Sequence, residues 1–170
     1  MSFYVGMIIS DDCPDSSLEQ LREVYGISLE EVSNPTIRQQ LDDGQRFYMF
    51  SDNKFGYFWD NWTPIGAGKI FEQAEILKRK PVESWQQAVG KQELEFNLKY
   101  KSFEAQMYKI IIKYLKIACN IRTVGIVGFM MNNTHDNFQF PVFHKKTVSL
   151  EDLDNDIIYE MEDEWIYYFE

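Results

Sequence analysis

The residue types that most often carry catalysis are scarce in this chain. It holds two cysteines, Cys13 and Cys119, and two histidines, His135 and His144. Three aspartates stand beside Cys13 within residues 11–15, and neighbouring negative charge raises the pKa of a thiol and disfavours the reactive thiolate. Neither cysteine belongs to a C-x-x-C motif; one disulfide between them is possible, but reduced thiols are the simpler interpretation. Because the spacing offers no nucleophile–base pair, we predict no catalytic residue and no enzyme activity.

Three patterns begin like ligand sites and then depart from them. The spaced aspartates of residues 152–156 resemble the start of a calcium loop, but Ile157 occupies the glycine position and Asp163 replaces the closing glutamate. The glycine-rich stretch 66–69 lacks the first glycine and the final hydroxyl residue of a phosphate-binding loop. The two histidines have no partner at zinc-binding spacing. We therefore expect no metal ion and no cofactor.

Charge, in contrast, is concentrated at one end of the chain. The 170 residues include 17 basic and 27 acidic ones, which gives a net charge of −10. Residues 150–170 contain nine of the acids and no base, so nearly all of the net charge lies there. A chain of this charge is not expected to bind nucleic acid or an anionic membrane surface through its general field.

The spacing within this acidic end suggests a surface. In an extended strand alternate residues face opposite sides, so carboxylates two positions apart form a row at intervals of about 6.7 Å. Their mutual repulsion is relieved by solvent or by a cationic partner, and interleaved aromatic residues are typical of interface hot spots. Two interpretations stay open: a solvated sheet face, or a docking surface for a basic protein. Five residues carry the second: Glu160, Glu162, Glu164, Trp165 and Tyr168.

Apolar runs and turn residues predict the strands that position this end. Phe3–Ser10 and Thr123–Asn132 are apolar runs that predict strands. Phe138–Leu150 predicts one or two more, and Pro141 favours the edge of a sheet. Asp156–Glu170 is predicted to close the chain as a strand or a hairpin.

A hairpin is predicted in the first half of the chain. Two aromatic-rich runs, Arg46–Ser51 and Lys54–Asp60, are separated by Asp52-Asn53, and both of these residue types tolerate the left-handed conformations of a tight turn. We therefore expect an aromatic hairpin over residues 46–60. The proline and glycines of residues 61–69 predict a loop directly after it.

Helices are predicted between these strands. Ser16 or Ser17 is suited to begin the first helix, and Gly26 to end it. A second short helix is expected over residues 28–32 or 36–41, and a third over 70–79.

Gln92–Asn120 is predicted to be the longest helix. At about 100° per residue, one of its sides is apolar throughout. That side carries Leu94, Leu98, Ala105, Tyr108, Ile111, Ile112, Leu115 and Cys119. Much of the other side is apolar as well, through Phe103, Met107, Ile110, Tyr114 and Ile117, and a polar stripe remains at Lys109, Lys113 and Lys116. We therefore expect this helix to be packed on several sides.

These elements predict a single α+β domain over residues 1–170. An antiparallel sheet is expected to pack on the helix at about 92–120, with shorter helices around it. The chain is 45% apolar, as globular proteins are, and no apolar run approaches the length that spans a membrane. The first ten residues lack the basic region of a secretory signal. We expect a cytoplasmic protein that does not bind membranes.

An acidic, aromatic-rich α+β chain without catalytic spacing resembles the bacterial immunity proteins, which protect a cell from its own polymorphic or contact-dependent toxin. The resemblance rests on the acidic run Glu151–Glu164 and on the aromatic residues Trp165, Tyr167 and Tyr168. It implies a cognate toxin as the partner, often a basic nuclease, and no direct contact with nucleic acid. The sequence does not indicate the oligomeric state.

A second class of function stays open. Trp59 and Trp62 lie in or beside the aromatic hairpin 46–60 and the loop 61–69. If the protein is instead a small enzyme or a ligand-binding protein, its pocket is expected near this hairpin and loop. A deep pocket with converging polar groups would favour that alternative.

Overall fold

The structure is a computed structural model that describes residues 2–50, 57–58, 64–131 and 139–170. Its strands are β1 (Ser2–Ser10), β2 (Leu29–Glu31), β3 (Gln45–Phe50), β4 (Tyr57–Phe58), β5 (Val124–Met131), β6 (His144–Val148) and β7 (Trp165–Phe169). They form one sheet in the order β2-β3-β1-β5-β7-β6, and β4 pairs with β1 outside this order. All pairings are antiparallel except that of β6 with β7.

Five α-helices and two irregular turns complete the described part of the chain. The helices are α1 (Asp15–Tyr25), α2 (Pro35–Arg38), α3 (Gly68–Lys78), α4 (Trp85–Lys113) and α5 (Asn155–Glu160). A π-helical turn, Tyr114–Ala118, continues α4, and a 3-10 turn, Leu150–Asp152, precedes α5. None of the helices described is long and apolar enough to cross a membrane.

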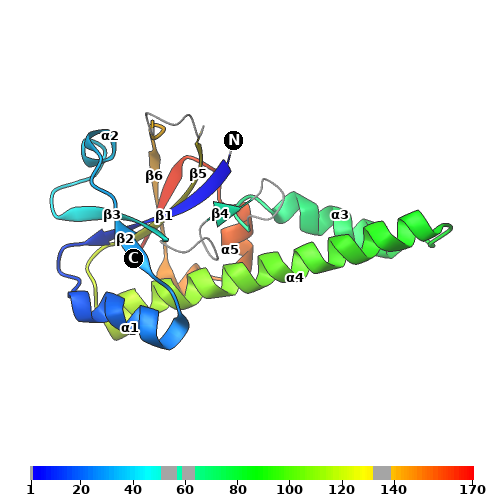
Figure 1. Ribbon diagram of the computed structural model, residues 1–170, viewed down its shortest axis with the longest axis horizontal. Coiled ribbons are helices and arrows are strands. Elements are labelled where there is room, and N and C mark those ends of the chain that lie inside the picture. Colours follow the sequence, from blue (N-terminus) through cyan, green and yellow to red (C-terminus); the bar gives the residue numbers. More distant parts are fainter. Residues whose placement is uncertain (1, 51–56, 59–63, 132–138) are drawn as a thin grey trace.

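The helices cover the two faces of the sheet unequally (Figure 1). α1, α4 and α5 lie on one face, and the short α2 lies on the other. α3 packs against α4 and α5, and together with the first half of α4 it extends away from the sheet. The sheet and its covering helices thus form a body from which a two-helix arm projects.

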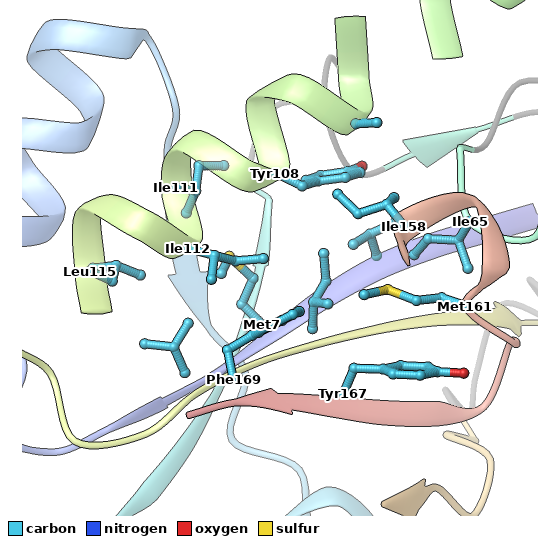
Figure 2. Close-up of a cluster of buried hydrophobic side chains, with 14 of the residues drawn as sticks. Met7, Ile65, Tyr108, Ile111, Ile112, Leu115, Ile158, Met161, Tyr167 and Phe169 are labelled. Carbon is cyan, nitrogen blue, oxygen red and sulfur yellow. The ribbon is translucent and has the colours of Figure 1, made fainter. Parts of the chain in front are cut away.

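The main core lies between the sheet and α4 (Figure 2). Alternation along β1 points Val5, Met7 and Ile9 towards the helices, and each is fully buried. From α4 and the turn after it come Tyr108, Ile111, Ile112 and Leu115, which meet Tyr167 and Phe169 of β7. Burial of each large aliphatic side chain stabilises the fold by roughly 1.5–3 kcal/mol, so this contact fixes α4 on the sheet.

A second, aromatic cluster lies on the opposite face of the sheet. Phe47, Phe129, Phe140 and Phe143 pack there with ring centroids 5.5–6.2 Å apart. Gly6 makes room for one of these rings: a Cβ atom at this position would lie 2.3 Å from Cζ of Phe47. The sheet therefore has two packed faces, and long helices cover only the face that carries the main core.

The fold class predicted from the sequence is confirmed. An antiparallel sheet packs on a long helix, and the strands predicted at residues 3–10 and 123–132 are β1 and β5. α1 ends at Gly26 in the left-handed conformation expected of that glycine. α3 occupies the helix predicted over 70–79. Of the two positions open for the second short helix, the later one is close to α2, and residues 29–31 form β2 instead.

The predicted aromatic hairpin is wrong. β3 and β4 both pair antiparallel with β1, so the two strands run in the same direction along one edge of it rather than against each other. Gly6 pairs with Met49 of β3, and Tyr4 pairs with Tyr57 of β4. The aromatic runs were correctly predicted as strand-forming, but pairing with the longer β1 replaces local pairing. The expected turn at Asp52-Asn53 lies outside the described residues.

The long helix also differs from its prediction in two respects. α4 begins at Trp85, seven residues before the predicted start, where the side chain of Ser84 accepts a hydrogen bond from the Gln87 amide. The side of the helix that packs on the sheet is the predicted one. The expectation of packing on several sides is confirmed only in part: Met107 and Tyr114 on the other side pack against the main core, but Phe103 and Ile117 remain more than half exposed.

Candidate functional site

The nine acidic side chains of residues 150–170, which we name the acidic segment, all lie on the surface. Five ion pairs occur among the described residues, and all of them join other parts of the chain. The charge of −9 in this segment therefore has no cation of the described residues within ion-pair distance.

The acidic segment does not form the extended strand predicted over residues 156–170. Residues 155–160 are helix α5, and strand β7 begins at Trp165. Asp154 explains the difference, because its carboxylate accepts a hydrogen bond from the Ile157 amide at 2.9 Å and so caps the helix. The alternation seen in the sequence thus spans two elements, and the predicted row of carboxylates along one strand face is wrong.

Three of the predicted site residues nevertheless lie close together on one connection. Glu160 is the last residue of α5, while Glu162 and Glu164 belong to the turn that leads into β7. Asp163 lies between them and is also exposed. We name residues 160–164 the acidic turn. Within five consecutive residues it presents four exposed carboxylates.

Backbone hydrogen bonds hold the acidic turn in place. The Glu162 amide donates to the Tyr167 hydroxyl at 2.9 Å, and the Glu164 amide donates to the Gly128 carbonyl at 2.7 Å. The Glu164 carbonyl in turn accepts from the His144 amide at 2.8 Å, and Glu164 has a positive φ of 64°. The turn is therefore tied to β5, β6 and β7. Its carboxylates project from a fixed backbone.

The two predicted aromatic site residues face opposite sides of the sheet. Trp165 is half-buried beside the main core, and its ring lies 4.9 Å from the His144 ring, centroid to centroid. Tyr168 packs against the aromatic cluster on the other face, where its hydroxyl donates to Oε1 of Gln45 at 3.2 Å. Burial, with a smaller contribution from Asp42, raises the pKa of Tyr168 to about 12. The structure thus joins Trp165, but not Tyr168, to the acidic turn.

The lysines of the neighbouring edge strand form no ion pair with the acidic segment. Lys145 of β6 forms an ion pair with Asp42 at 3.4 Å, and the ammonium of Lys146 lies 5.9 Å from the centre of the Tyr167 ring. β6 is the last strand of the sheet, as Pro141 suggested, and exposed lysines on an edge strand oppose edge-to-edge aggregation. These lysines limit the acidic surface on one side.

The cysteines and histidines do not form a reactive site in the described structure. Burial is the largest cause that raises the pKa of the Cys13 thiol to about 11, and Cys119, Asp12 and Asp15 add to it. Both cysteines are free thiols. His144 is exposed beside Trp165, and His135 lies outside the described residues. No cluster of three metal-ligating side chains occurs within residues 2–50, 57–58, 64–131 and 139–170.

Two buried charged residues on α4 were missed by the sequence analysis. Lys101 and Glu104 are each only 1% exposed. Burial lowers the pKa of Lys101 to about 8. Burial also raises the pKa of Glu104 to about 7, against a hydrogen bond from the Tyr100 hydroxyl that lowers it. Oε2 of Glu104 has no hydrogen-bond partner in the structure.

This buried pair was detectable from spacing. Lys101 and Glu104 lie three residues apart on the same helical side as Leu98, Ala105 and Tyr108, so the predicted core side already contained them. A carboxyl group with a pKa near 7 is able to take up or release a proton at neutral pH. The Glu104 carboxyl is only 1% exposed, which leaves a substrate no access to it, so we assign it no reaction.

One groove in the described structure touches the region of the alternative hypothesis, because Arg46 and Phe47 of the predicted hairpin belong to its lining. It has a volume of about 480 Å³ and lies between α2 and the start of β3. Its charged lining is partly neutralised within the fold, since Arg46 pairs with Glu31 at 3.7 Å and Asp42 with Lys145. Residues 51–56 and 59–63 of this hairpin and loop, including Trp59 and Trp62, lie outside the described residues.

Comparison with protein families, with curated proteins and with solved structures gave no match to this chain.

Proposed function

We propose that this chain is a binding protein that recognises a basic protein through the acidic turn and Trp165. In its specific form, the proposal is that it acts as a bacterial immunity protein, which neutralises a cognate basic toxin in the cytoplasm. The observation that carries it is the exposure of all nine carboxylates of the acidic segment, with none in an ion pair within the described structure.

Electrostatics explains why such a surface suits this role. Unpaired carboxylates on a fixed backbone attract a basic protein at long range, and steering of this kind speeds association by about 10–10³-fold at low salt. Trp165 lies directly after the acidic turn and is half-buried, so part of its ring area is available to a partner. Tyr168 is left out of the proposed surface because it faces the other side of the sheet.

The test measures binding kinetics with a basic toxin domain encoded beside this gene. Replacement of Glu160, Glu162 and Glu164 by glutamine is expected to slow association about tenfold or more at low salt and to flatten its salt dependence. Trp165→Ala is expected to speed dissociation instead. Co-expression of the chain with the toxin should also restore growth of cells that the toxin alone kills.

A matched variant separates a specific surface from net charge. Glu23→Gln, Glu30→Gln and Asp43→Asn together remove the same number of charges from exposed sites on α1, on β2 and before β3, elements that do not pair with β7. If this variant slows association as much as the acidic-turn variant, the effect comes from net charge and the proposed surface is wrong. Unchanged rates for the acidic-turn variant at both low and high salt would contradict the proposal as well.

A further inference from the structure

The far end of the two-helix arm exposes apolar side chains (Figure 1). α3 ends there and α4 begins there, and 14 of the 16 residues from 75 to 90 are exposed. Of the eleven large apolar residues that are exposed in the described structure, five lie in this short stretch: Ile76, Leu77, Val82, Trp85 and Val89. Trp85 is the largest of them and is 72% exposed. We name residues 76–91 the arm tip.

The arm tip is basic, although the chain as a whole is acidic. It contains four bases, Lys78, Arg79, Lys80 and Lys91, and one acid, which gives a net charge of +3. The adjoining parts of the arm, residues 68–75 and 92–99, contain two bases and four acids, a net charge of −2. Lys78 forms an ion pair with Glu75 at 2.8 Å, and the other three bases form none within the described residues. Positive charge is therefore concentrated at the far end of the arm.

A groove lies at the arm tip, between the end of α3 and the start of α4. Its volume is about 390 Å³, within the range of small-molecule sites. Leu77, Val82 and Leu94 give it an apolar lining, and Lys80 and Lys91 belong to the same lining. Hydrocarbon contacts combined with two ammonium groups suit a molecule that has both an apolar part and a negative charge, as an anionic phospholipid has.

Distance separates the arm tip from the acidic segment. The hydroxyl group of Tyr159, next to the acidic turn, donates a hydrogen bond to Ser102 of α4 at 3.2 Å. Trp85 lies 17 residues before Ser102, about 25 Å along the helix. At physiological salt, charges are screened over about 8 Å, so the acidic segment does not cancel the field of the arm tip. The expectation that the chain does not bind an anionic membrane rests on its net charge, and the charge at the arm tip has the opposite sign.

The shape of the arm tip favours a fluid surface over a second protein. Neighbouring residues on a helix point about 100° apart, so Ile76 and Leu77 do not face one flat surface together. A stable protein interface needs roughly 800 Å² of complementary surface on each partner, whereas lipid adapts to side chains that point in several directions around a projecting end. Tryptophan is enriched at the boundary between water and bilayer, and lysine and arginine are attracted to anionic headgroups.

We propose that the arm tip binds the surface of an anionic phospholipid membrane. Trp85 and Val82 enter the layer between headgroups and acyl chains, and Arg79 and Lys80 contact the lipid phosphates. The arm then holds the acidic body away from the negatively charged surface. This binding is peripheral and uses none of the residues of the acidic turn, so it is independent of the proposed function.

Co-sedimentation with lipid vesicles tests the proposal. At about 0.1 M salt the chain is expected to pellet with vesicles of phosphatidylcholine that contain about 30% phosphatidylserine, and not with pure phosphatidylcholine. Arg79→Gln combined with Lys80→Gln should lower the partition coefficient at least about tenfold. Trp85→Ala should lower it at least about fivefold, because it removes apolar area from the bilayer. Circular dichroism checks that each variant folds.

Matched variants separate the arm tip from net charge and general apolarity. Arg38→Gln combined with Lys113→Gln removes one arginine and one lysine from exposed sites outside the arm, and Phe103→Ala removes an exposed aromatic ring from the same helix. Both controls should bind the vesicles as the unaltered chain does.

Three outcomes would overturn the proposal: no binding to the anionic vesicles, equal binding to pure phosphatidylcholine, or equal losses in the tip variants and their controls. If the chain ignores vesicles but binds polyglutamate through Arg79 and Lys80, the arm tip recognises an acidic protein instead, and the proposal is wrong.

Discussion

The acidic segment carries its charged side chains on the surface, whereas the centre of α4 carries two of them in the core. Nine carboxylates of the acidic segment are exposed, whereas Lys101 and Glu104 are 1% exposed in the core of the body. In the first setting, water screens the charges, so they cost folding little and remain available to a partner. In the second, burial disfavours the charged forms and shifts both pKa values towards neutrality. Exposed charge should therefore govern binding, and buried charge should govern how stability depends on pH.

The buried carboxyl group should give the largest effect on stability. The pKa of Glu104 is about 7 in the folded chain, above its ordinary value of 4.5, so the folded state binds more protons than the unfolded state between these values. The free energy of unfolding should therefore fall as pH rises from 4.5 to 7, by up to about 3 kcal/mol, and then level off. Glu104→Gln should remove this fall and be more stable than the wild type at pH 8.

Urea denaturation of both chains between pH 4.5 and 8 measures this difference. The variant with glutamine at the acidic turn in place of Glu160, Glu162 and Glu164 is the control, because those carboxylates are exposed. If the wild-type and Glu104→Gln curves remain parallel over this range, Glu104 does not hold a proton in the folded protein.

Lys101 should act in the opposite direction at higher pH. Its pKa is lowered to about 8, so the folded state loses this proton before the unfolded state does. The free energy of unfolding should rise from pH 8 to pH 10, relative to that of a Lys101→Met variant, by about 2 kcal/mol. The difference between the two chains isolates Lys101 from tyrosines and Cys13, which titrate at high pH in both. A constant difference across this range would contradict the assigned pKa shift.

The body of the fold was predictable because its pattern is local and repeated. The continuous apolar run Phe3–Ser10 predicts a buried strand, and the apolar side of α4 predicts the side that packs on the sheet. The hairpin failed because a tight turn was inferred from two residues, while pairing of β3 with β1 depends on residues about 40 positions away. The residues of a turn do not indicate which distant strand the neighbouring residues will pair with. The other side of α4 was visible as apolar in the sequence, but only the structure shows that Phe103 and Ile117 on it stay exposed while Met107 and Tyr114 pack on the core.

The sequence identified the acidic residues of the candidate site but not the helix and turn that carry them. The exposure of Glu160, Glu162 and Glu164 agrees with expectation, yet a helix cap at Asp154 converts half of the predicted strand into α5. A period-two pattern cannot be told from a short helix followed by a strand when acids and apolar residues mix. Tyr168 was grouped with the acids on this mistaken geometry.

The helix cap that positions the acidic turn should have an intermediate effect. Asp154→Ala removes the hydrogen bond to the Ile157 amide and should lower the free energy of unfolding by about 1 kcal/mol. Tyr159 of α5 remains tied to Ser102 by a 3.2 Å hydrogen bond, so the loss should stay local. Asp154→Asn is the control, since asparagine also caps a helix and lacks the charge. Equal losses for both variants would show that the charge, and not the cap, stabilises α5.

Removal of three exposed charges should have the smallest effect on stability. Replacement of Glu160, Glu162 and Glu164 by glutamine should change the free energy of unfolding by less than about 0.5 kcal/mol in 0.15 M salt, because solvent already screens these carboxylates. One substitution at Glu104 should therefore outweigh three at the acidic turn. Thermal or urea unfolding at low and high salt provides the measurement.

A stabilisation that is large at low salt and absent at high salt would change the interpretation of the acidic turn. It would mean that repulsion among Glu160, Glu162 and Glu164 already strains the folded state, and that a cationic partner would relieve this strain on binding. A salt-independent loss of stability would mean instead that one of these carboxylates has a structural contact, and exposed charge would then not be reserved for binding. Only a small change at both salt concentrations agrees with the contrast between the acidic segment and the centre of α4, in which surface charge is separate from the stability of the fold.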